Sequence, residues 1–381
     1  MALGSFAIFA NLYCVQPLLP LFSQEFGKDL LESTLVLTMG TFGLAGSLIL
    51  YGALSDAIGR YWLMLFSVFA SLMVSIMMLA VNSFEQLVFL RFLHGVVLGA
   101  LPAVAIAYIG EEFSPHLIPG VVGVYIATNT LGGISGRLVG GFISDYFHWK
   151  ILFWFMALIN MASLAILYFW LSPPKNFVRR PIQYLGMLKD ISLHLKQFDL
   201  LAIYLVIGIA FGVFINLYSY LAFILVKPPF NVGAGFIGML FVTYLAGTLA
   251  SIISGRVVNK LGALPTILLG LIVVMCGTAF LFSDSLKIKI AGLLVNSFGL
   301  FLAHSVSSGW VNRQAKKAKA SASALYLVFY YLGATVAPTL LYPFWNIDGW
   351  SSLLYGAEFY LLCSLIILLL LLIKRSRNQS S

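Results

Sequence analysis

The chain has little charge and few cysteines. Charged residues make up 9% of its 381 residues, whereas a soluble domain is typically about 25% charged. Its three cysteines, Cys14, Cys276 and Cys363, are far apart and lie inside apolar segments. No disulfide framework and no metal-ligand spacing is visible. The sequence also contains no nucleophile motif and no phosphate loop. We therefore expect neither an enzyme nor a bound metal or cofactor.

Long apolar segments fill the chain instead. Hydrophobic residues make up 61% of it, and the mean hydropathy is +1.00. A helix needs about 20 apolar residues to cross a bilayer. Twelve segments meet this requirement, at about 3–22, 33–54, 61–81, 86–110, 118–143, 150–171, 200–226, 235–255, 264–283, 288–310, 320–343 and 350–373. The sequence therefore predicts an all-α membrane protein with twelve transmembrane helices.

The longest interruption between these segments covers residues 172–199. Apolar residues recur through it at helical spacing, at Ile182, Leu185, Leu188, Ile191 and Leu195. This pattern, together with several basic residues, predicts an amphipathic helix on the membrane surface. We expect an N-terminal six-helix bundle over 1–171, a cytoplasmic linker over 172–199 and a C-terminal six-helix bundle over 200–381.

The net charge of +9 could indicate nucleic-acid binding, but the placement of the basic residues along the chain indicates a membrane protein instead. With the N-terminus in the cytoplasm, fifteen of the 22 Lys and Arg residues fall on the cytoplasmic side and five on the outer side. This bias fits the positive-inside rule. The basic charge orients the chain and faces anionic lipid. We expect both termini to be cytoplasmic, with the lipid bilayer rather than nucleic acid as the partner.

The two halves of the chain repeat a short loop. Gly52-Ala-Leu-Ser-Asp-Ala-Ile-Gly-Arg60 follows the second segment, and Gly255-Arg-Val-Val-Asn-Lys-Leu-Gly262 follows the eighth. Both loops lie at the same place in a six-helix unit. Two six-helix halves with a substrate site between them are the layout of one large class of secondary transporters.

The fifth segment carries a glycine ladder and an arginine. The ladder consists of Gly123, Gly132, Gly136, Gly140 and Gly141, and Arg137 follows its third member. In lipid, glycines at four-residue spacing let another helix pack closely. An arginine at the bilayer centre costs at least about 3 kcal/mol, so it needs a function or a local partner.

On these residues the chain resembles the major facilitator superfamily over nearly its whole length. Gly52, Asp56, Gly59 and Arg60 match its cytoplasmic loop motif, although Tyr61 replaces a basic residue. The ladder resembles the fifth-helix pattern of the drug:proton antiporters, with Arg137 in place of proline. Stretches such as Asn11–Pro20 and Asn216–Tyr220 resemble the acriflavine-sensitivity branch. The resemblance implies two pseudo-symmetric bundles, with the ladder as a sliding contact at the domain interface.

The loop motif implies a cytoplasmic gate. A charge pair at a helix end can lock two halves together in one state and release them in another. Glu111 and Glu112, at the cytoplasmic end of the fourth segment, are the expected partners of Arg60. Asp56 could cap the N-terminus of another helix, where the macrodipole favours an acid. A solvated turn is the alternative interpretation.

Four residues inside the spans are candidates for coupling charge or proton movement: Arg91, Arg137, Glu358 and His304. Arg91 and Gly95 look like the superfamily's Arg-x-x-x-Gly motif. Arg91 is either a fixed charge that tunes a nearby protonation site or binds an anion, or a side chain that reaches the outer interface. Arg137 is either a charge in the cavity or an anchor at the interface. Glu358 is the only acid well inside a span, so it is the candidate proton carrier and the only candidate counter-ion for either arginine. His304 is a second candidate for the proton.

Polar and aromatic residues on the first, seventh, tenth and eleventh segments are the candidates for the substrate cavity. Tyrosines suit a site that is apolar yet offers hydrogen bonds, and the same residues can also hold helices together. The candidates are Asn11, Tyr13, Gln16, Asn216, Tyr220, Asn296, Tyr326 and Tyr330.

The sequence thus predicts a monomeric secondary transporter of the bacterial inner membrane that works by alternating access. The resemblance implies export of small organic compounds, driven by the proton gradient. The first alternative is a porter for an anionic metabolite or a sugar, which the excess of arginine over acid inside the spans favours. The second is a membrane-embedded enzyme or a sensor that transports nothing.

Overall fold

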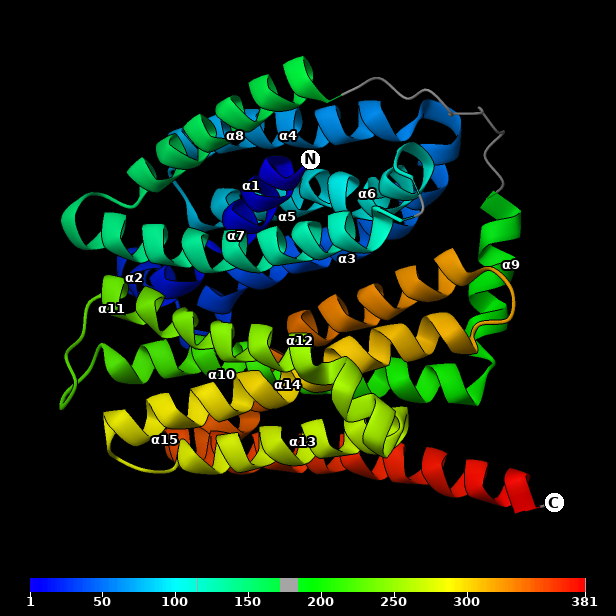
Figure 1. Ribbon diagram of the computed structural model, residues 1–381. Helices are drawn as coiled ribbons and strands as arrows, with labels where there is room; N and C mark the ends of the chain where they lie inside the picture. The colour runs from blue at the N-terminus through cyan, green and yellow to red at the C-terminus, as the bar shows by residue number, and fades with distance from the viewer. Residues whose placement is uncertain (115, 172–183, 381) are drawn as a thin grey trace. The chain divides into compact units, whose positions relative to one another are not determined.

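The computed structural model describes residues 1–114, 116–171 and 184–380, and within these ranges the chain is helical without a strand (Figure 1). The first six spans comprise α1 (Ala2–Tyr13), η1 (Gln16–Leu18), α2 (Leu19–Phe26), α3 (Leu30–Ile58), α4 (Arg60–Met77), η2 (Met78–Ala80), α5 (Phe84–Leu98), α6 (Ala100–Glu112), α7 (Ile118–Tyr146) and α8 (Lys150–Trp170). A connecting helix, α9 (Tyr184–Leu195), follows. The last six spans comprise α10 (Phe198–Leu225), α11 (Ala234–Met239), η3 (Leu240–Thr243), α12 (Tyr244–Leu261), α13 (Ala263–Phe280), α14 (Leu286–Gln314) and α15 (Lys319–Ser380).

Ten helical stretches in the described part of the chain are long and apolar enough to cross a membrane. The last of them, Lys319–Arg377, has 59 residues, enough for two crossings at about 20 residues each. It is broken at Asp348 and Gly349, and Gly349 has a φ of +59°. With α7, which is 29 residues long, the count is the twelve spans that the hydropathy pattern predicts.

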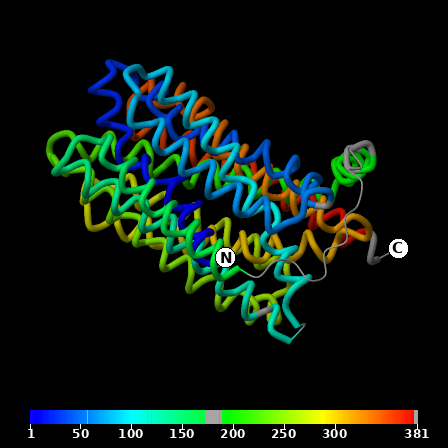
Figure 2. The backbone as a smooth tube through the Cα atoms, turned by 90° about the horizontal axis from the view of Figure 1, so that it is seen from above, coloured from blue at the N-terminus to red at the C-terminus, as the bar shows by residue number. Residues whose placement is uncertain are grey.

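The chain divides into two compact units. The first contains Met1–Leu185 and Leu225–Phe241, and the second contains Gly186–Ile224 and Val242–Ser381. The short helix α11 therefore groups with the first unit, although its span continues through η3 into α12 of the second. Figure 2 shows the backbone of both units as bundles of long helices. Residues 172–183 of the expected linker lie outside the described residues.

The two repeated loops share a backbone conformation. Gly59 joins α3 to α4 with a φ of +99°, and Gly262 joins α12 to α13 with a φ of +85°. A residue with a β-carbon rarely adopts such angles. The last glycine of each loop is therefore needed for the sharp turn between two spans, and it is found at equivalent places in both halves.

The halves also share a mode of helix packing. In the first unit, β-carbons added at Gly132, Gly136 and Gly140 of α7 would overlap backbone carbonyls of α1. In the second unit, β-carbons at Gly208 and Gly212 of α10 would meet the backbone of α15. The first and fifth spans of each half thus approach backbone to backbone, as small residues permit in a membrane.

Candidate functional site

The first span is broken near its middle. Helix α1 ends at Tyr13, and a short 3-10 turn leads into α2. Pro17 and Pro20 lie in this stretch, and proline has no N–H to continue a helical hydrogen-bond ladder. The last carbonyls of α1 therefore face the interior of the unit without the usual helical partners. Such carbonyls attract a positive charge.

Arg91 of α5 supplies that charge. Its side chain is fully buried. Its Nη1 donates to the carbonyl of Asn11 at 3.0 Å, its Nη2 donates to that of Leu12 at 2.5 Å, and its Nε donates to Val36 of α3 at 3.0 Å. In the described ranges no carboxylate contacts Arg91. Backbone dipoles, rather than an acid, therefore accommodate this buried guanidinium.

The spacing of Arg91 and Gly95 has a direct structural reason. A β-carbon at Gly95 would overlap the carbonyl of Gly40 on α3, so the two helices touch there. One turn earlier on both helices, Arg91 reaches the carbonyl of Val36. Gly95, four residues after Arg91, lets α3 come close enough for this hydrogen bond. The same contact positions Arg91 toward the end of α1.

A network of buried polar groups extends from Arg91 across the first unit. His94 Nδ1 lies 3.2 Å from Arg91 Nη1, and its Nε2 lies 2.8 Å from Ser71 Oγ on α4. A guanidinium can only donate, so Nδ1 accepts and His94 is neutral with its proton on Nε2. Asn160 of α8 donates to Ser71 at 3.0 Å and pairs with Asn11 at 3.0 and 3.3 Å. Four helices are thereby joined at the broken first span.

Arg137 lies on the other side of the same break. It is 1% exposed, its Nε donates to Gln16 Oε1 at 2.7 Å, and its Nη1 donates to the carbonyl of Gly133 at 2.9 Å. The guanidinium carbon lies 4.0 Å from the ring centre of Tyr13 and 4.3 Å from that of Phe241. Two aromatic faces and an amide thus surround the charge, which is a strong cation–π arrangement.

The glycine ladder does not act as one surface. Gly132, Gly136 and Gly140 contact α1 within the first unit, so the expectation that they form the interface between domains is wrong. A β-carbon at Gly123 would have nothing within 4 Å, whereas one at Gly141 would overlap the carbonyl of Ala234 on α11. The four-residue spacing therefore fits the helix against the first span, which was not identified from the sequence.

Helix α11 is fixed to the end of α7 by a carboxylate. The two oxygens of Asp145 accept hydrogen bonds from the backbone N–H groups of Ala234 and Gly235 at 2.8 and 2.9 Å. A β-carbon at Gly238 would lie 2.6 Å from the carbonyl of Arg137. The acid thus caps the first turn of α11, and small residues let the two helices touch. The sequence analysis did not single out Asp145.

The expected gate pair is present. Arg60 Nη1 lies 2.6 and 2.7 Å from the two carboxylate oxygens of Glu111. Arg60 begins α4 and Glu111 lies in the last turn of α6, so the pair ties two helix ends of the first unit. Asp56 lies in α3, but its side chain is outside the described residues. That Arg60 and Glu111 act as a gate stays a prediction, as do the roles of Gly52 and Glu112 in it.

In the second unit, aromatic rings gather around His304 of α14. Tyr326 of α15 has its hydroxyl 2.8 Å from His304 Nδ1, and the ring of Tyr330 lies 4.7 Å from the imidazole. Tyr330 also stacks on Phe211 of α10, with ring centres 3.5 Å apart. Phe301 lies 6.5 Å from the imidazole at a steep angle. We call these five rings the His304 cluster.

The other expected cavity residues of the second unit make buried contacts between helices. Asn216 Nδ2 donates to the carbonyl of Ala334 at 3.0 Å, and the Tyr220 hydroxyl donates to that of Pro338 at 2.9 Å. Asn296 Nδ2 donates to Thr278 Oγ1 at 2.8 Å. These three side chains therefore hold neighbouring spans together.

Glu358 lies in the second half of α15. Its Oε1 is buried and has no hydrogen-bond partner in the described part of the chain. Glu358 lies in the second unit and both arginines lie in the first, so its expected role as the counter-ion of Arg91 or Arg137 stays a prediction. The polar network that begins at Arg91 includes Ser71 and Asn160, which the sequence analysis missed. Asn160 is the only amide in its span, and that could have indicated it.

Comparison with known proteins identifies the family. The Major Facilitator Superfamily model matches residues 1–338, so the chain belongs to this superfamily. It is 33% identical over 362 residues to an uncharacterized MFS-type transporter, YybF of Bacillus subtilis, covering 95% of this chain and 90% of YybF. It is 35% identical over 349 residues to the inner membrane transport protein YnfM of Escherichia coli, covering 91% and 83%.

A solved structure shows the same fold. The nucleoside transporter NupG matches 97% of this chain and 98% of its own with a TM-score of 0.79, at 12% identity. The protein is thus a multi-pass secondary transporter with the major facilitator fold, and its chemistry is the movement of a small molecule rather than an enzymatic reaction.

Proposed function

We propose that this transporter exports small, uncharged aromatic compounds in exchange for protons. The His304 cluster is the observation that carries the proposal. It combines the stacked rings of Phe211 and Tyr330 with the hydrogen-bonded pair of His304 and Tyr326. Mostly apolar sites with a few placed polar groups are typical of small-molecule binding. The resemblance of the loop and helix motifs to drug:proton antiporters supports export.

Glu358 is the proposed proton carrier. A buried carboxylate without a partner pays a large desolvation penalty in its charged form, and the Oε1 of Glu358 is in that position. A change of conformation that brings water to this oxygen would let it ionise, and the reverse change would favour the neutral acid. The proton gradient can drive a transport cycle through such a group.

The proposed location is the bacterial inner membrane, with both termini in the cytoplasm and the protein acting as a monomer. The loops carry the positive charge that orients a membrane protein, and the related YnfM is named as an inner membrane protein. In this orientation Arg60 and Glu111 lie at the cytoplasmic side, where they would open and close one access path.

A second candidate function is transport of an organic anion. Arg137 favours it, because a guanidinium held between Tyr13 and Phe241 at the break of the first span could bind a carboxylate or a phosphate. Arginine recognises such groups through paired hydrogen bonds. Gln16 would then position the guanidinium and not the substrate.

Matched compounds separate the two candidates. The purified protein is reconstituted into liposomes that contain a pH-sensitive dye, and benzamide or benzoate, and nicotinamide or nicotinate, are added under a pH gradient. Protein-free liposomes correct for passive permeation. We expect the amides to cause protein-dependent proton movement. Movement with the carboxylates alone would favour the anion porter, and no movement with any compound of the panel would count against the proposed substrate class.

Glu358→Gln tests the proton carrier in the same liposomes. We expect the variant to lose proton-driven accumulation and keep exchange of labelled substrate across the membrane, because exchange needs no net proton transfer. Asp190→Asn, on the connecting helix α9, is the control for removing a carboxylate outside the spans. Normal proton-driven accumulation by Glu358→Gln would exclude this carboxylate as the carrier.

A further inference from the structure

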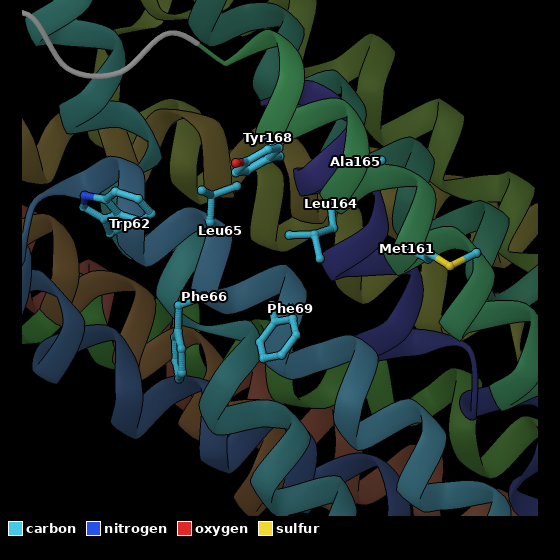
Figure 3. Close-up of a pocket in the computed structure, with 8 residues that line it drawn as sticks. All are labelled: Trp62, Leu65, Phe66, Phe69, Met161, Leu164, Ala165 and Tyr168. Carbon is cyan, nitrogen blue, oxygen red and sulfur yellow. The ribbon is translucent and has the colours of Figure 1, made fainter.

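A groove on the outside of the first unit has no assigned role. It lies between α4 and α8 and has a volume of about 560 Å³ (Figure 3). Trp62, Leu65 and Phe69 line it from α4, and Met161, Ala165 and Tyr168 line it from α8. Leu65 is buried at 7% exposure, whereas Trp62 and Phe69 are 59% and 50% exposed. The groove therefore has an apolar floor and accessible aromatic walls.

The position of the groove along the helices indicates its depth in the bilayer. Trp62 lies in the first turn of α4 and Tyr168 in the last turn of α8, so both mark the same end of the unit. The lining residues span seven positions on each helix, from Trp62 to Phe69 and from Met161 to Tyr168, which is about 10 Å at 1.5 Å per residue. The hydrocarbon core is about 30 Å thick, so the groove extends through about two thirds of one leaflet.

The lining is suited to an amphiphile. Its polar atoms, the indole nitrogen of Trp62 and the hydroxyl of Tyr168, belong to residues in the terminal turns of the two helices (Figure 3). Trp and Tyr are enriched at the boundary between hydrocarbon and headgroups. The deeper part offers no partner for water, and apolar cavities stay dry. An occupant must therefore be apolar over most of one leaflet and polar at one end.

A small side chain creates the groove. Ala165 lies between Met161, four residues before it, and Tyr168, three residues after it, on the same face of α8. Residues at these spacings are neighbours on a helix surface. A larger side chain at this position would fill the space between them. All the residues that line the groove belong to the first unit.

We propose that this groove is a binding site for one acyl chain of a phospholipid from the leaflet on the side of Arg60. The part of an acyl chain that is nearest its ester matches the groove in length, and the ester and headgroup would lie beside Trp62 and Tyr168. Held there, the lipid fills the space between α4 and α8 and stabilises the packing of the first unit.

Native mass spectrometry tests the proposal on the full-length protein. The protein is reconstituted into vesicles of phosphatidylethanolamine and phosphatidylglycerol, extracted in mild detergent, and weighed with its retained lipids. Ala165→Trp fills the groove, and Ile76→Trp, at an exposed site on α4 outside the groove, is the control. We expect the wild-type protein and Ile76→Trp to retain one phospholipid that Ala165→Trp does not, with the helical content of all three unchanged.

Fluorescence provides a second test that needs no bulky variant. The protein and its Trp62→Phe variant are compared in vesicles whose phospholipids carry bromine on the acyl chain, which quenches nearby indoles. The difference in emission between the two proteins is the emission of Trp62. We expect this emission to be strongly quenched at a fraction of brominated lipid that quenches the remaining tryptophans only in part. Equal lipid retention by Ala165→Trp, a retained molecule that is not a phospholipid, or a dimer that Ala165→Trp separates would each overturn the proposal.

Discussion

Replacement of Arg91 should destabilise the protein, because its guanidinium donates hydrogen bonds to the last carbonyls of α1. In Arg91→Met the carbonyls of Asn11 and Leu12 lose their charged donor in a buried site. A buried polar group left without a partner costs about 1–3 kcal/mol, so the two carbonyls together lose about 2–6 kcal/mol. Removing a buried charge offsets part of this loss.

The expected effect can be measured as a change in melting temperature. In a unit of about 200 residues, 1 kcal/mol corresponds to about 2–4 °C, so a net loss of 2 kcal/mol lowers the melting temperature by about 4–8 °C. A thermal-shift assay in detergent measures this. Arg91→Lys should lose less, because one ammonium can donate to both carbonyls but cannot also reach Val36 and His94.

Two controls decide what Arg91 does. Lys150→Met removes a positive charge at the start of α8 and should leave the melting temperature unchanged, since no described hydrogen bond to a carbonyl depends on its side chain. If Arg91→Met melts within about 1 °C of the wild type but transports poorly, the arginine acts on the substrate and the reasoning above is refuted.

Three further outcomes are expected. Gly136→Ala should lower the melting temperature, because its β-carbon would overlap a carbonyl of α1, which costs about 1–3 kcal/mol. Gly123→Ala, where the space is open, should leave the melting temperature unchanged. Equal melting temperatures of the two variants would contradict backbone packing of α7 on α1. Asp145→Ala should lose about 0.5–2 kcal/mol of capping energy, because the carboxylate accepts from two N–H groups of α11. Hydrogen exchange at the start of α11 should increase as a result. Unchanged exchange would argue against the cap. Exchanging the charges of Arg60 and Glu111 should restore transport that either single reversal abolishes; a double variant as inactive as the single ones would show that more than this pair is needed.

Hydropathy predicted most of the fold. The edges of the expected spans agree with the helices within a few residues, as for α8, expected at 150–171 and observed at Lys150–Trp170. Each span is determined by its own residues, because every backbone group in lipid must be satisfied within the helix. The ion pair of Arg60 and Glu111 was also predicted, because the motif and the helix ends place both residues on one side of the membrane.

The candidate site was predicted less completely. The arginines were identified, and Asn11, Tyr13 and Gln16 were named as cavity residues, but the contacts between them were not predicted. Most of the partners are backbone carbonyls and aromatic rings, which carry no motif. The carbonyls of Asn11 and Leu12 are available only because α1 stops at Tyr13. Pro17 and Pro20 indicate such a break, yet nothing local shows that an arginine about 80 residues later faces it.

The sequence by itself determined that this protein is a twelve-span transporter, since hydropathy, loop charge and loop motifs are local properties of the chain. Only the tertiary structure decided which helix receives the glycines of α7 and which groups accommodate Arg91 and Arg137. These contacts join residues more than 50 positions apart, and their energies depend on close approach between helices. The glycines allow that approach, but the packing of the whole unit selects the helix that makes it.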